Sequence, residues 1–344
     1  MTGVVLEDGE FFAGTSVGAP GSAFGEAVFA TAMTGYQELV TDPSYSGQIL
    51  CFTAPMVGNY GVAPERSESP APQVRAVVMR EARGPAWIDW LIEHGVVALT
   101  GVDTRALVIH LRERGAMRAG IVATPEELEE TLAVVRSRPR MEGLALVAEV
   151  STREPYVAHE GGDVRIAVVD YGCKRSIRSR LAAAGAAVIV YPHDVDADEL
   201  TAYDGVVLSN GPGDPEPLHE EIATVCNLVG RVPVLGICLG HQLLALATGY
   251  ETYKLPFGHR GANHPVLERD TGRVLVTSQN HGFAVRETED RAATHVSLYD
   301  GTVEGLDYPE LRARSLQFHP EAGPGPHDAW PLLAEWVEEV RLAA

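Results

Sequence analysis

The stretch Val234–Gln242 reads VLGICLGHQ and decides the fold of the C-terminal half of the chain. Its apolar start, Val234–Ile237, predicts a buried strand, and Leu239–Thr248 has the residue spacing of an amphipathic helix. Cys238 lies at the junction, with one glycine two positions before it and another two positions after it. A sharp strand-to-helix turn exposes a nucleophile, and the start of a helix favours the thiolate form of cysteine. The stretch therefore predicts an activated cysteine at the carboxyl end of a strand.

Predicted strands and helices also alternate on the N-terminal side of that stretch. Apolar runs at Val164–Val169, Ala187–Tyr191 and Gly205–Ser209 predict further strands, and Lys174–Ala184 predicts a helix. Strands that alternate with helices indicate an α/β fold with a mostly parallel sheet, flanked by helices on both faces. In such sheets a ligand site lies at the carboxyl ends of the strands.

The N-terminal part of the chain predicts a smaller domain of mixed α and β structure. Strands are expected at Gln48–Thr53 and Val74–Met79, and helices over Trp87–His94 and from Asp103 to Leu111. The polar segment 151–162, STREPYVAHEGG, predicts a linker because it lacks apolar periodicity and ends in two glycines. A chain of 344 residues also exceeds the usual single-domain size. We therefore expect domains at 1–150 and 163–344.

The charge balance excludes some classes of partner. The net charge is −20, from 27 basic and 47 acidic residues, and no long basic run offsets it. Such a surface repels nucleic-acid phosphates and anionic membranes, so neither is expected as a partner. No stretch approaches the roughly 20 apolar residues of a membrane span, and the N-terminus lacks the pattern of a signal peptide.

The four cysteines, Cys51, Cys173, Cys226 and Cys238, predict a reducing compartment and a cytoplasmic protein. They are too few for a disulfide framework and lack the paired CxxC spacing of a zinc site. The histidines also show no HxxxH or mixed His/Cys pattern, so no metal site is predicted. We interpret His241, His264 and His281 as structural, hydrogen-bonded residues.

A nucleophilic cysteine needs a base, and the base needs a group that orients it. The stretch Ser315–Glu321 reads SLQFHPE, so His319 and Glu321 are two positions apart at the end of an expected strand and can face the same side. On this motif alone, an exposed His and Glu at a strand end would be an equally good interpretation. A free cysteine is likewise more often an inert core residue. Taken together, Cys238, His319 and Glu321 favour catalysis.

The stretch Ser209–Pro215 reads SNGPGDP and directly follows an expected strand. Its composition is that of an ordinary tight turn. Its place in the chain also allows one of its backbone N–H groups, together with that of Leu239, to form an oxyanion hole for a tetrahedral intermediate.

These three elements together resemble the class I glutamine amidotransferases, in which Cys, His and Glu hydrolyse glutamine. Further motifs narrow the resemblance to the family of small, glutamine-hydrolysing subunits of carbamoyl phosphate synthetase. The motifs are KLPFGHRGANHPV at 254–266, TSQNHGFAV at 277–285 and HPEAGPGPHD at 319–328, and in the N-terminal part MTGYQE at 33–38, TDPSYSGQ at 41–48, GNYG at 58–61 and GVDTRAL at 101–107. They cover nearly the whole chain.

The resemblance implies a role for individual residues. Cys238 would attack the glutamine side-chain amide and form a glutamyl thioester, His319 would transfer protons, and Glu321 would orient His319. Glutamine would be held by Ser46 of the N-terminal domain and by Gly211, Gly213, Leu239, Gln242, Asn280, Gly282 and Phe283. The ammonia would pass to a large synthetase subunit, which would use bicarbonate, ATP and Mg²⁺ to make carbamoyl phosphate for arginine and pyrimidines. No cofactor is expected in this chain.

Two alternatives remain beside this interpretation. The chain could be the glutaminase subunit of another synthase, such as those of anthranilate or guanine nucleotide synthesis, although the motifs of residues 1–150 argue against it. It could also be a non-catalytic scaffold subunit, against which the intact Cys238, His319 and Glu321 argue. Three positions depart from the family pattern, namely Ala30, Cys173 and Ser176. They are expected to affect only local contacts.

Overall fold

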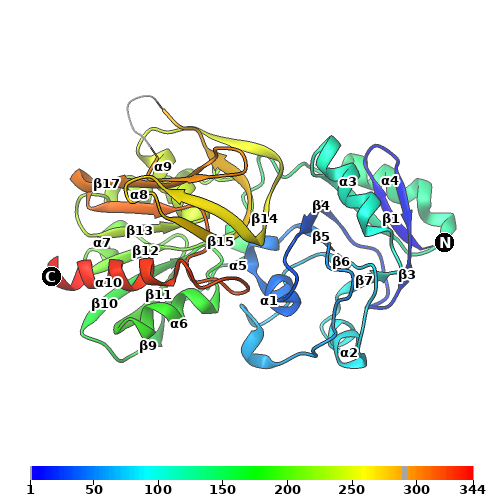
Figure 1. The fold of residues 1–344 in the computed structure, drawn as a ribbon, viewed down its shortest axis with the longest axis horizontal. Coiled ribbons are helices and arrows are strands. Elements are labelled where there is room, and N and C mark those ends of the chain that lie inside the picture. Colours follow the sequence, from blue (N-terminus) through cyan, green and yellow to red (C-terminus); the bar gives the residue numbers. More distant parts are fainter. Residues whose placement is uncertain (1, 289–292, 344) are drawn as a thin grey trace. The chain divides into compact units, whose positions relative to one another are not determined.

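The computed structural model describes residues 2–288 and 293–343, and the chain divides into two compact units (Figure 1). The smaller unit comprises Met1–Leu144 and Pro256–Arg260, and the larger comprises Ala145–Leu255 and Gly261–Ala344. Each unit has helices packed against a sheet. This confirms the predicted α/β fold class.

Within the described residues, the smaller unit has one sheet of eight strands, in the order β2-β1-β8-β4-β5-β6-β7-β3. Its strands β4, β5, β6 and β7 run parallel to one another, and the remaining pairs are antiparallel. The strands are β1 Gly3–Leu6, β2 Phe11–Ala13, β3 Thr15–Ser16, β4 Phe24–Ala30, β5 Gln48–Phe52, β6 Ala76–Val78, β7 Val97–Thr100 and β8 Met117–Val122. The helices are α1 Tyr36–Thr41, α2 Pro85–Glu93, α3 Thr104–Arg114 and α4 Leu128–Ser137, with short 3₁₀ turns at Pro43–Tyr45, Pro64–Arg66 and Pro125–Glu127.

Helix α3 illustrates how the sequence sets a local element. The Asp103 side chain accepts a hydrogen bond from the Ala106 N–H at 3.1 Å, which caps the first turn. Gly115 follows the last turn with φ 95°, a conformation that favours glycine. Leu107 and Leu111 lie on the buried face and pack in the core of this unit. The predicted strands and helices of the N-terminal part each coincide with an observed element.

The larger unit contains a sheet of ten strands within the described residues, in the order β15-β14-β16-β17-β18-β13-β12-β10-β11-β9. The strands are β9 Tyr156–His159, β10 Val164–Asp170, β11 Ala186–Pro192, β12 Gly205–Leu208, β13 Val234–Ile237, β14 Thr252–Glu268, β15 Val274–Val285, β16 His295–Ser297, β17 Val303–Tyr308 and β18 Ala313–Leu316. The helices are α5 Val147–Val150, α6 Arg175–Ala183, α7 Ala197–Leu200, α8 His219–Leu228, α9 Leu239–Ala247 and α10 Trp330–Ala343, with a 3₁₀ turn at Pro309–Leu311.

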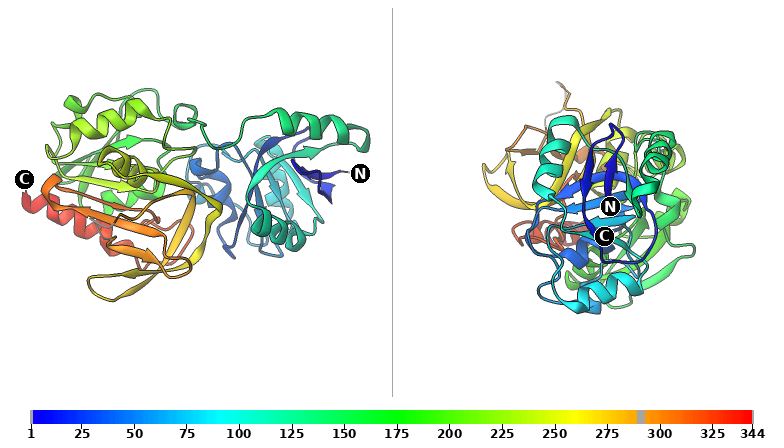
Figure 2. Two further views of the ribbon diagram at one scale, coloured as in Figure 1. Left: turned by 90° about the horizontal axis from the view of Figure 1, so that it is seen from above. Right: turned by 90° about the vertical axis from the view of Figure 1, so that its right-hand side faces the viewer.

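Five neighbouring strands of this sheet, β11, β10, β12, β13 and β18, are parallel. Their side chains alternate between two cores, as the pleat of a strand requires. In β10, Ala167 and Val169 pack in the core that includes α8 and α9, whereas Ile166 and Val168 pack in the core that includes α6 and α10. Helices therefore cover both faces, and the C-terminal helix α10 lies beside α6 (Figures 1 and 2).

The segment 151–162 differs from the predicted linker. Its residues Tyr156–His159 form β9, which pairs antiparallel with β11 at the edge of the larger sheet. The side chains of β9 are exposed, so the segment has no buried apolar face to mark it as a strand. An edge strand is held by main-chain hydrogen bonds and tolerates polar residues. The division between the units falls earlier, after Leu144.

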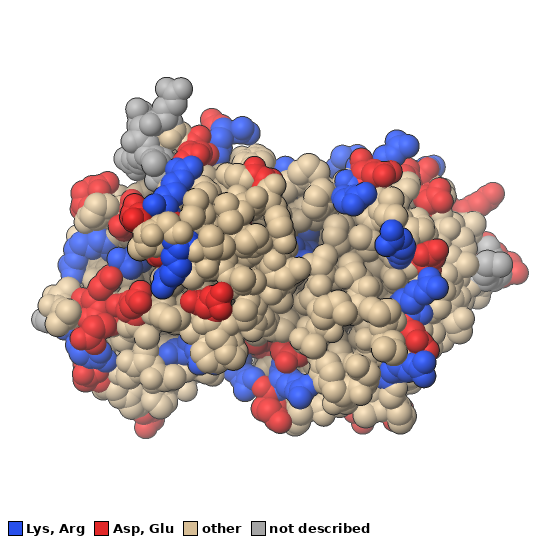
Figure 3. All heavy atoms as spheres, in the orientation of Figure 1, with Lys and Arg blue, Asp and Glu red and all other residues tan. Residues whose placement is uncertain are grey.

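The surface carries both signs of charge. On the face drawn in Figure 3, acidic and basic side chains are interspersed, without an extended basic area among the described residues. Across the described part of the chain, every helix is too short or too polar to cross a membrane.

Candidate active site

Four parallel strands of the larger sheet end beside one another, so the residues that follow them lie at the same edge. Cys238 directly follows β13, His319 follows β18, Lys174 follows β10 and Gly211 follows β12. These strands are neighbours in the order β18-β13-β12-β10. The carboxyl edge of a parallel sheet is where such folds bind ligands, so this edge is the candidate site.

Cys238 lies in a strained turn between β13 and α9. Its φ of 55° and ψ of −103° are unusual for a residue with a side chain, and such strain is concentrated at functional sites. The Cys238 N–H donates to the Leu316 carbonyl at 2.8 Å, and the Gly240 N–H donates to the Ser209 carbonyl at 3.0 Å. A Cβ at Gly240 would overlap the Leu208 carbonyl oxygen. Glycine is thus required where α9 begins against β12.

Replacing Gly240 with alanine is expected to lower the free energy of unfolding by about 1–3 kcal/mol, the usual cost of overpacking. Helix propensity alone predicts the opposite, a gain of up to about 1 kcal/mol. The clash with the Leu208 carbonyl decides the sign, because backbone cannot move aside as a flexible side chain can. Denaturant unfolding of the two proteins measures the difference. An unchanged or raised stability would show that propensity outweighs the clash.

His319 and Glu321 form a buried pair. The His319 Nδ1–H donates to Glu321 Oε1 at 2.7 Å, and both side chains are at most 1 % exposed. The His319 N–H donates to the Ser278 carbonyl at 2.9 Å, which holds the segment after β18 in place. Burial is the largest single influence and lowers the pKa of His319, but Glu321 and Cys238 together outweigh it and raise the pKa to about 10. The pair can therefore hold a proton at the site.

Lys174 is a site residue that the sequence did not reveal. Its Nζ donates to Glu321 Oε1 at 2.9 Å and to the Ala322 carbonyl at 3.2 Å, and its side chain is only 2 % exposed. Burial raises the pKa of Glu321, but Lys174 and then His319 outweigh burial and lower the pKa to about 2. Glu321 is therefore ionised between two cations. The one feature of the sequence that could have indicated this role is a lysine at the carboxyl end of a buried strand. Its charge has a partner only in the folded protein.

The loop before α6 is built to hold Lys174. Asp170 accepts hydrogen bonds from the Gly172 and Cys173 N–H groups at 3.0 and 2.6 Å. The Lys174 N–H donates to Asn210 Oδ1 at 3.1 Å, so the loop is tied to the turn after β12. Cys173 itself is buried and contacts the Lys174 carbonyl through its thiol at 3.4 Å. This contact places Cys173, one of the three departures from the family pattern, next to the site.

The thiol of Cys238 is buried near His319. It donates to the Asn280 carbonyl at 3.6 Å and is 2 % exposed. Cys238 also contributes to the raised pKa of His319, although the His319 Nε2 atom has no hydrogen-bond partner among the described residues. That nitrogen is therefore available to exchange a proton with the thiol or with a ligand.

Several residues predicted to hold glutamine belong to α9, which begins directly after Cys238, and to the β15 segment that contacts its thiol. Leu239 is the first residue of α9, so its N–H has no acceptor within the helix. Gln242 Nε2 donates to the Phe283 carbonyl at 2.9 Å, which joins α9 to the β15 segment that also contains Asn280 and Gly282. A Cβ at Gly211 would overlap the Tyr171 carbonyl and approach the Leu239 side chain at 2.7 Å.

Gly213 and Ser46 are the two remaining residues that are predicted to contact glutamine. Gly213 has φ 92° and forms an isolated β-bridge with Ala145. Ser46 belongs to the smaller unit, where it is buried and donates its N–H to the Pro43 carbonyl at 2.9 Å. Its place as a glutamine contact stays a prediction.

Two histidines near the site have structural hydrogen bonds. His241 Nδ1 lies 2.8 Å from Ser315 Oγ, and burial lowers the pKa of His241 to about 3. A neutral imidazole this deeply buried can only be a weak base. His281 Nδ1 donates to the Phe283 carbonyl at 2.7 Å, which helps to fix the position of that carbonyl.

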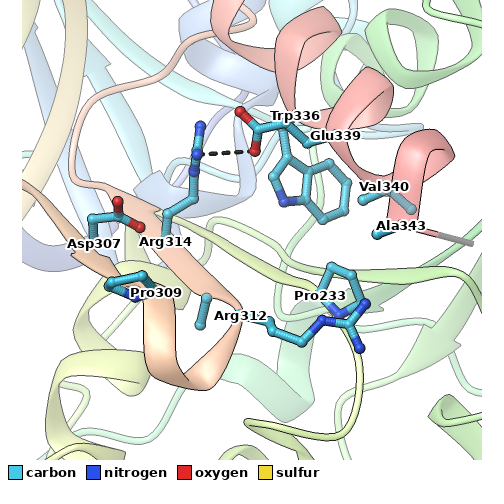
Figure 4. Close-up of a pocket in the computed structure, with 10 residues that line it drawn as sticks. Pro233, Asp307, Pro309, Arg312, Arg314, Trp336, Glu339, Val340 and Ala343 are labelled. Carbon is cyan, nitrogen blue, oxygen red and sulfur yellow. Dashed lines mark ion pairs between the residues drawn. The ribbon is translucent and has the colours of Figure 1, made fainter.

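A cavity of about 220 Å³ in the same unit lies away from these residues (Figure 4). It is lined by Pro233 and Ala313, which stand at the amino ends of β13 and β18, and by Trp336 of α10. The ion pair between Arg314 and Glu339, with N and O 2.9 Å apart, closes one side. The cavity is thus at the opposite edge of the sheet from Cys238.

Comparison with known proteins gives a consistent result. The family model "Glutamine amidotransferase class-I" matches residues 167–338, and "Carbamoyl-phosphate synthase small chain, CPSase domain" matches residues 4–121. The carbamoyl phosphate synthase small chain of Methanopyrus kandleri is 47% identical over 359 residues, which cover 99% of this chain and 98% of the relative. That of Syntrophotalea carbinolica is 46% identical and covers 97% and 96%, and that of Listeria monocytogenes is 46% identical and covers 97% and 95%.

Proposed function

Because this chain belongs to the carbamoyl phosphate synthase small chain family, we propose that it hydrolyses L-glutamine and delivers the ammonia to a large synthetase subunit. That subunit would make carbamoyl phosphate from bicarbonate and ATP, for arginine and pyrimidine synthesis. The observation that carries the hydrolytic step is the buried His319–Glu321 pair beside the strained turn of Cys238.

The chemistry follows from the order of these groups. His319, whose raised pKa keeps the imidazole protonated, holds the proton of the Cys238 thiol on Nε2, and the thiolate sulfur attacks the amide carbon of glutamine. The amide oxygen gains negative charge, which the Leu239 N–H at the start of α9 would stabilise. As the C–N bond breaks, His319 gives its proton to the leaving nitrogen. Ammonia and a Cys238 thioester result.

A water molecule completes the cycle. His319 takes a proton from the water while the oxygen attacks the thioester carbon. The second tetrahedral intermediate then releases glutamate, and the proton returns to the sulfur of Cys238. Glu321 stays ionised throughout, because Lys174 and His319 hold its pKa low against burial. Its role is to orient the imidazole and stabilise the imidazolium form.

Glutamine binding is assigned to residues from three segments of the larger unit. They are Gly211 and Gly213 after β12, Leu239 and Gln242 of α9, and Asn280, Gly282 and Phe283 of β15. Ser46 of the smaller unit is included from the family resemblance. The proposal places no cofactor in this chain, since ATP and Mg²⁺ would act in the large subunit. The four free thiols support a cytoplasmic location.

Reconstitution with a carbamoyl phosphate synthase large subunit tests this function. We expect the mixture to form carbamoyl phosphate from bicarbonate, ATP and glutamine labelled with ¹⁵N in the side-chain amide, and the label to appear in the product. The large subunit alone should use ammonium but not glutamine. Absence of glutamate release would contradict the hydrolytic assignment. Glutamate release without labelled product, while ammonium still supports synthesis, would contradict the assigned partner.

A further inference from the structure

Two buried glutamine side chains face each other beside Cys238. Gln242 Nε2 donates to Gln317 Oε1 at 3.1 Å and to the Phe283 carbonyl at 2.9 Å. Gln242 is 3 % exposed, and Gln317 is fully buried. Gln317 follows β18 and precedes His319 by two positions, and its N–H donates to the Glu304 carbonyl at 2.9 Å. The backbone of Gln317 is thus fixed between β17 and the catalytic histidine.

These contacts determine which way the Gln242 amide points. A backbone carbonyl such as that of Phe283 can only accept, so the nitrogen of Gln242 must face it. The second hydrogen of that nitrogen goes to Gln317, which must then present its oxygen. Both donors of the Gln242 amide are used, and its oxygen, Oε1, has no hydrogen bond within the described residues. The Gln242 Oε1 atom is therefore available to accept a hydrogen bond from a ligand.

The orientation of the Gln317 side chain leaves one of its buried polar atoms without a hydrogen bond. With its oxygen toward Gln242, the Gln317 Nε2 atom is buried without a hydrogen-bond partner among the described residues. A buried, unpaired donor is unfavourable. Reversing the amide would bring two NH₂ groups face to face and leave Gln242 without an acceptor. Polar groups that stay unsatisfied in a native protein are often found at functional sites.

We propose that Gln317 is a positioning residue that holds Gln242 Oε1 toward the α-ammonium group of the substrate. Gln317 would thereby contribute to the selection of L-glutamine over amides without that group. The inference rests on the proposed glutamine hydrolysis. Gln242 lies one helical turn, about 5.4 Å, beyond Cys238, and that length is comparable with the four bonds between the amide carbon and the α-nitrogen. Since the amide nitrogen is the leaving group, the α-ammonium is the substrate donor that remains for this acceptor.

A pair of variants tests the inference. Gln317→Met keeps the length of the side chain and removes the acceptor, whereas Gln317→Glu keeps both the shape and an acceptor for Gln242. The ligands are L-glutamine and 4-carbamoylbutanoate, which is glutamine without the α-amino group and is measured as a competitor of glutamine. We expect Gln317→Met to raise KM for glutamine about tenfold, as a weakened hydrogen bond to a charged group would. The inhibition constant of the analogue and kcat should change less than about threefold by the same reasoning.

The control variant and a double-mutant cycle distinguish positioning from packing. Gln317→Glu should keep the preference for glutamine over the analogue within about threefold of the wild type. In a Gln242→Met background, adding Gln317→Met should cost no further preference, because Gln317 acts through Gln242. Gln317→Leu provides a second apolar replacement if the methionine variant does not fold.

Several results would overturn the inference. Equal losses for glutamine and the analogue would mean that Gln317 only supports the packing of the site. An unchanged KM in the apolar variants, or additive losses in the double variant, would mean that Gln242 keeps its orientation without Gln317. Failure of the wild type to hydrolyse glutamine would instead contradict the proposed function itself, so the two failures are distinguishable.

Discussion

Replacing Cys238 with serine is expected to abolish glutamine hydrolysis and leave ammonium-dependent synthesis by the reconstituted complex intact. A hydroxyl is a much poorer nucleophile than a thiol, so attack on the amide carbon should be lost. Loss of the nucleophile in a comparable hydrolytic triad lowers kcat by up to about 10⁶-fold. We therefore expect a loss of at least about 10⁴-fold in glutamate release, on the same scale. Ammonium bypasses the step, so carbamoyl phosphate formation from ammonium should stay within twofold.

Cys226→Ser is the matched control for this variant. Cys226 is an exposed thiol in α8, and its sulfur contacts the Ala247 carbonyl at 3.5 Å. Its replacement should leave both activities unchanged. Equal rates of glutamate release from the wild type and Cys238→Ser would contradict the catalytic assignment. Parallel loss of the ammonium-dependent activity would indicate that the variant disturbs assembly with the large subunit instead.

The turn at Cys238 could be predicted from sequence because each of its requirements is local. An apolar strand, a cysteine and two glycines lie within seven consecutive residues, and the structure shows the expected strand, strained turn and helix. The glycines are needed because α9 starts in contact with β12. His319 and Glu321 were similarly recognisable, because two positions at the end of β18 suffice to bring them together.

Lys174 was not predictable in the same way, because its partner lies 147 positions along the chain. In the sequence, a lysine before a helix indicates an exposed charge. Only the parallel pairing of strands places the loop after β10 near the segment after β18. Strand β9 was missed for a related reason, since its pairing with β11 leaves no pattern in its exposed side chains.

Replacing Lys174 with methionine is expected to lower kcat for glutamine hydrolysis about 100-fold, within the range for general acid–base catalysis. The Lys174 ammonium and the His319 imidazolium share the same oxygen of Glu321. Lys174 lowers the pKa of His319, against the opposing effect of Glu321. Without Lys174, the pKa of His319 should rise further, and the imidazolium should release its proton less readily. The limb of the pH–rate profile that belongs to His319 should therefore move to higher pH.

Arg175→Met is the control, because Arg175 is the exposed cation next in sequence. It should leave kcat and the pH profile unchanged. A fall in kcat without any shift of the profile in Lys174→Met would mean that Lys174 acts through geometry alone. An unchanged kcat would contradict a role for Lys174 in positioning Glu321.

Lys174→Met should also lower the free energy of unfolding by about 3–5 kcal/mol, because it leaves the buried Glu321 carboxylate without one of its partners.

Folding lowers the pKa of Glu321 from 4.5 to about 2. This carboxylate therefore contributes stability above pH 4.5 that disappears as the pH falls toward 2. Lys174 is the largest of the influences that lower this pKa, so in Lys174→Met the pKa should move back up. Acid unfolding, followed by circular dichroism, should then begin at a higher pH than in the wild type. Coincident acid transitions would show that His319 alone keeps Glu321 ionised.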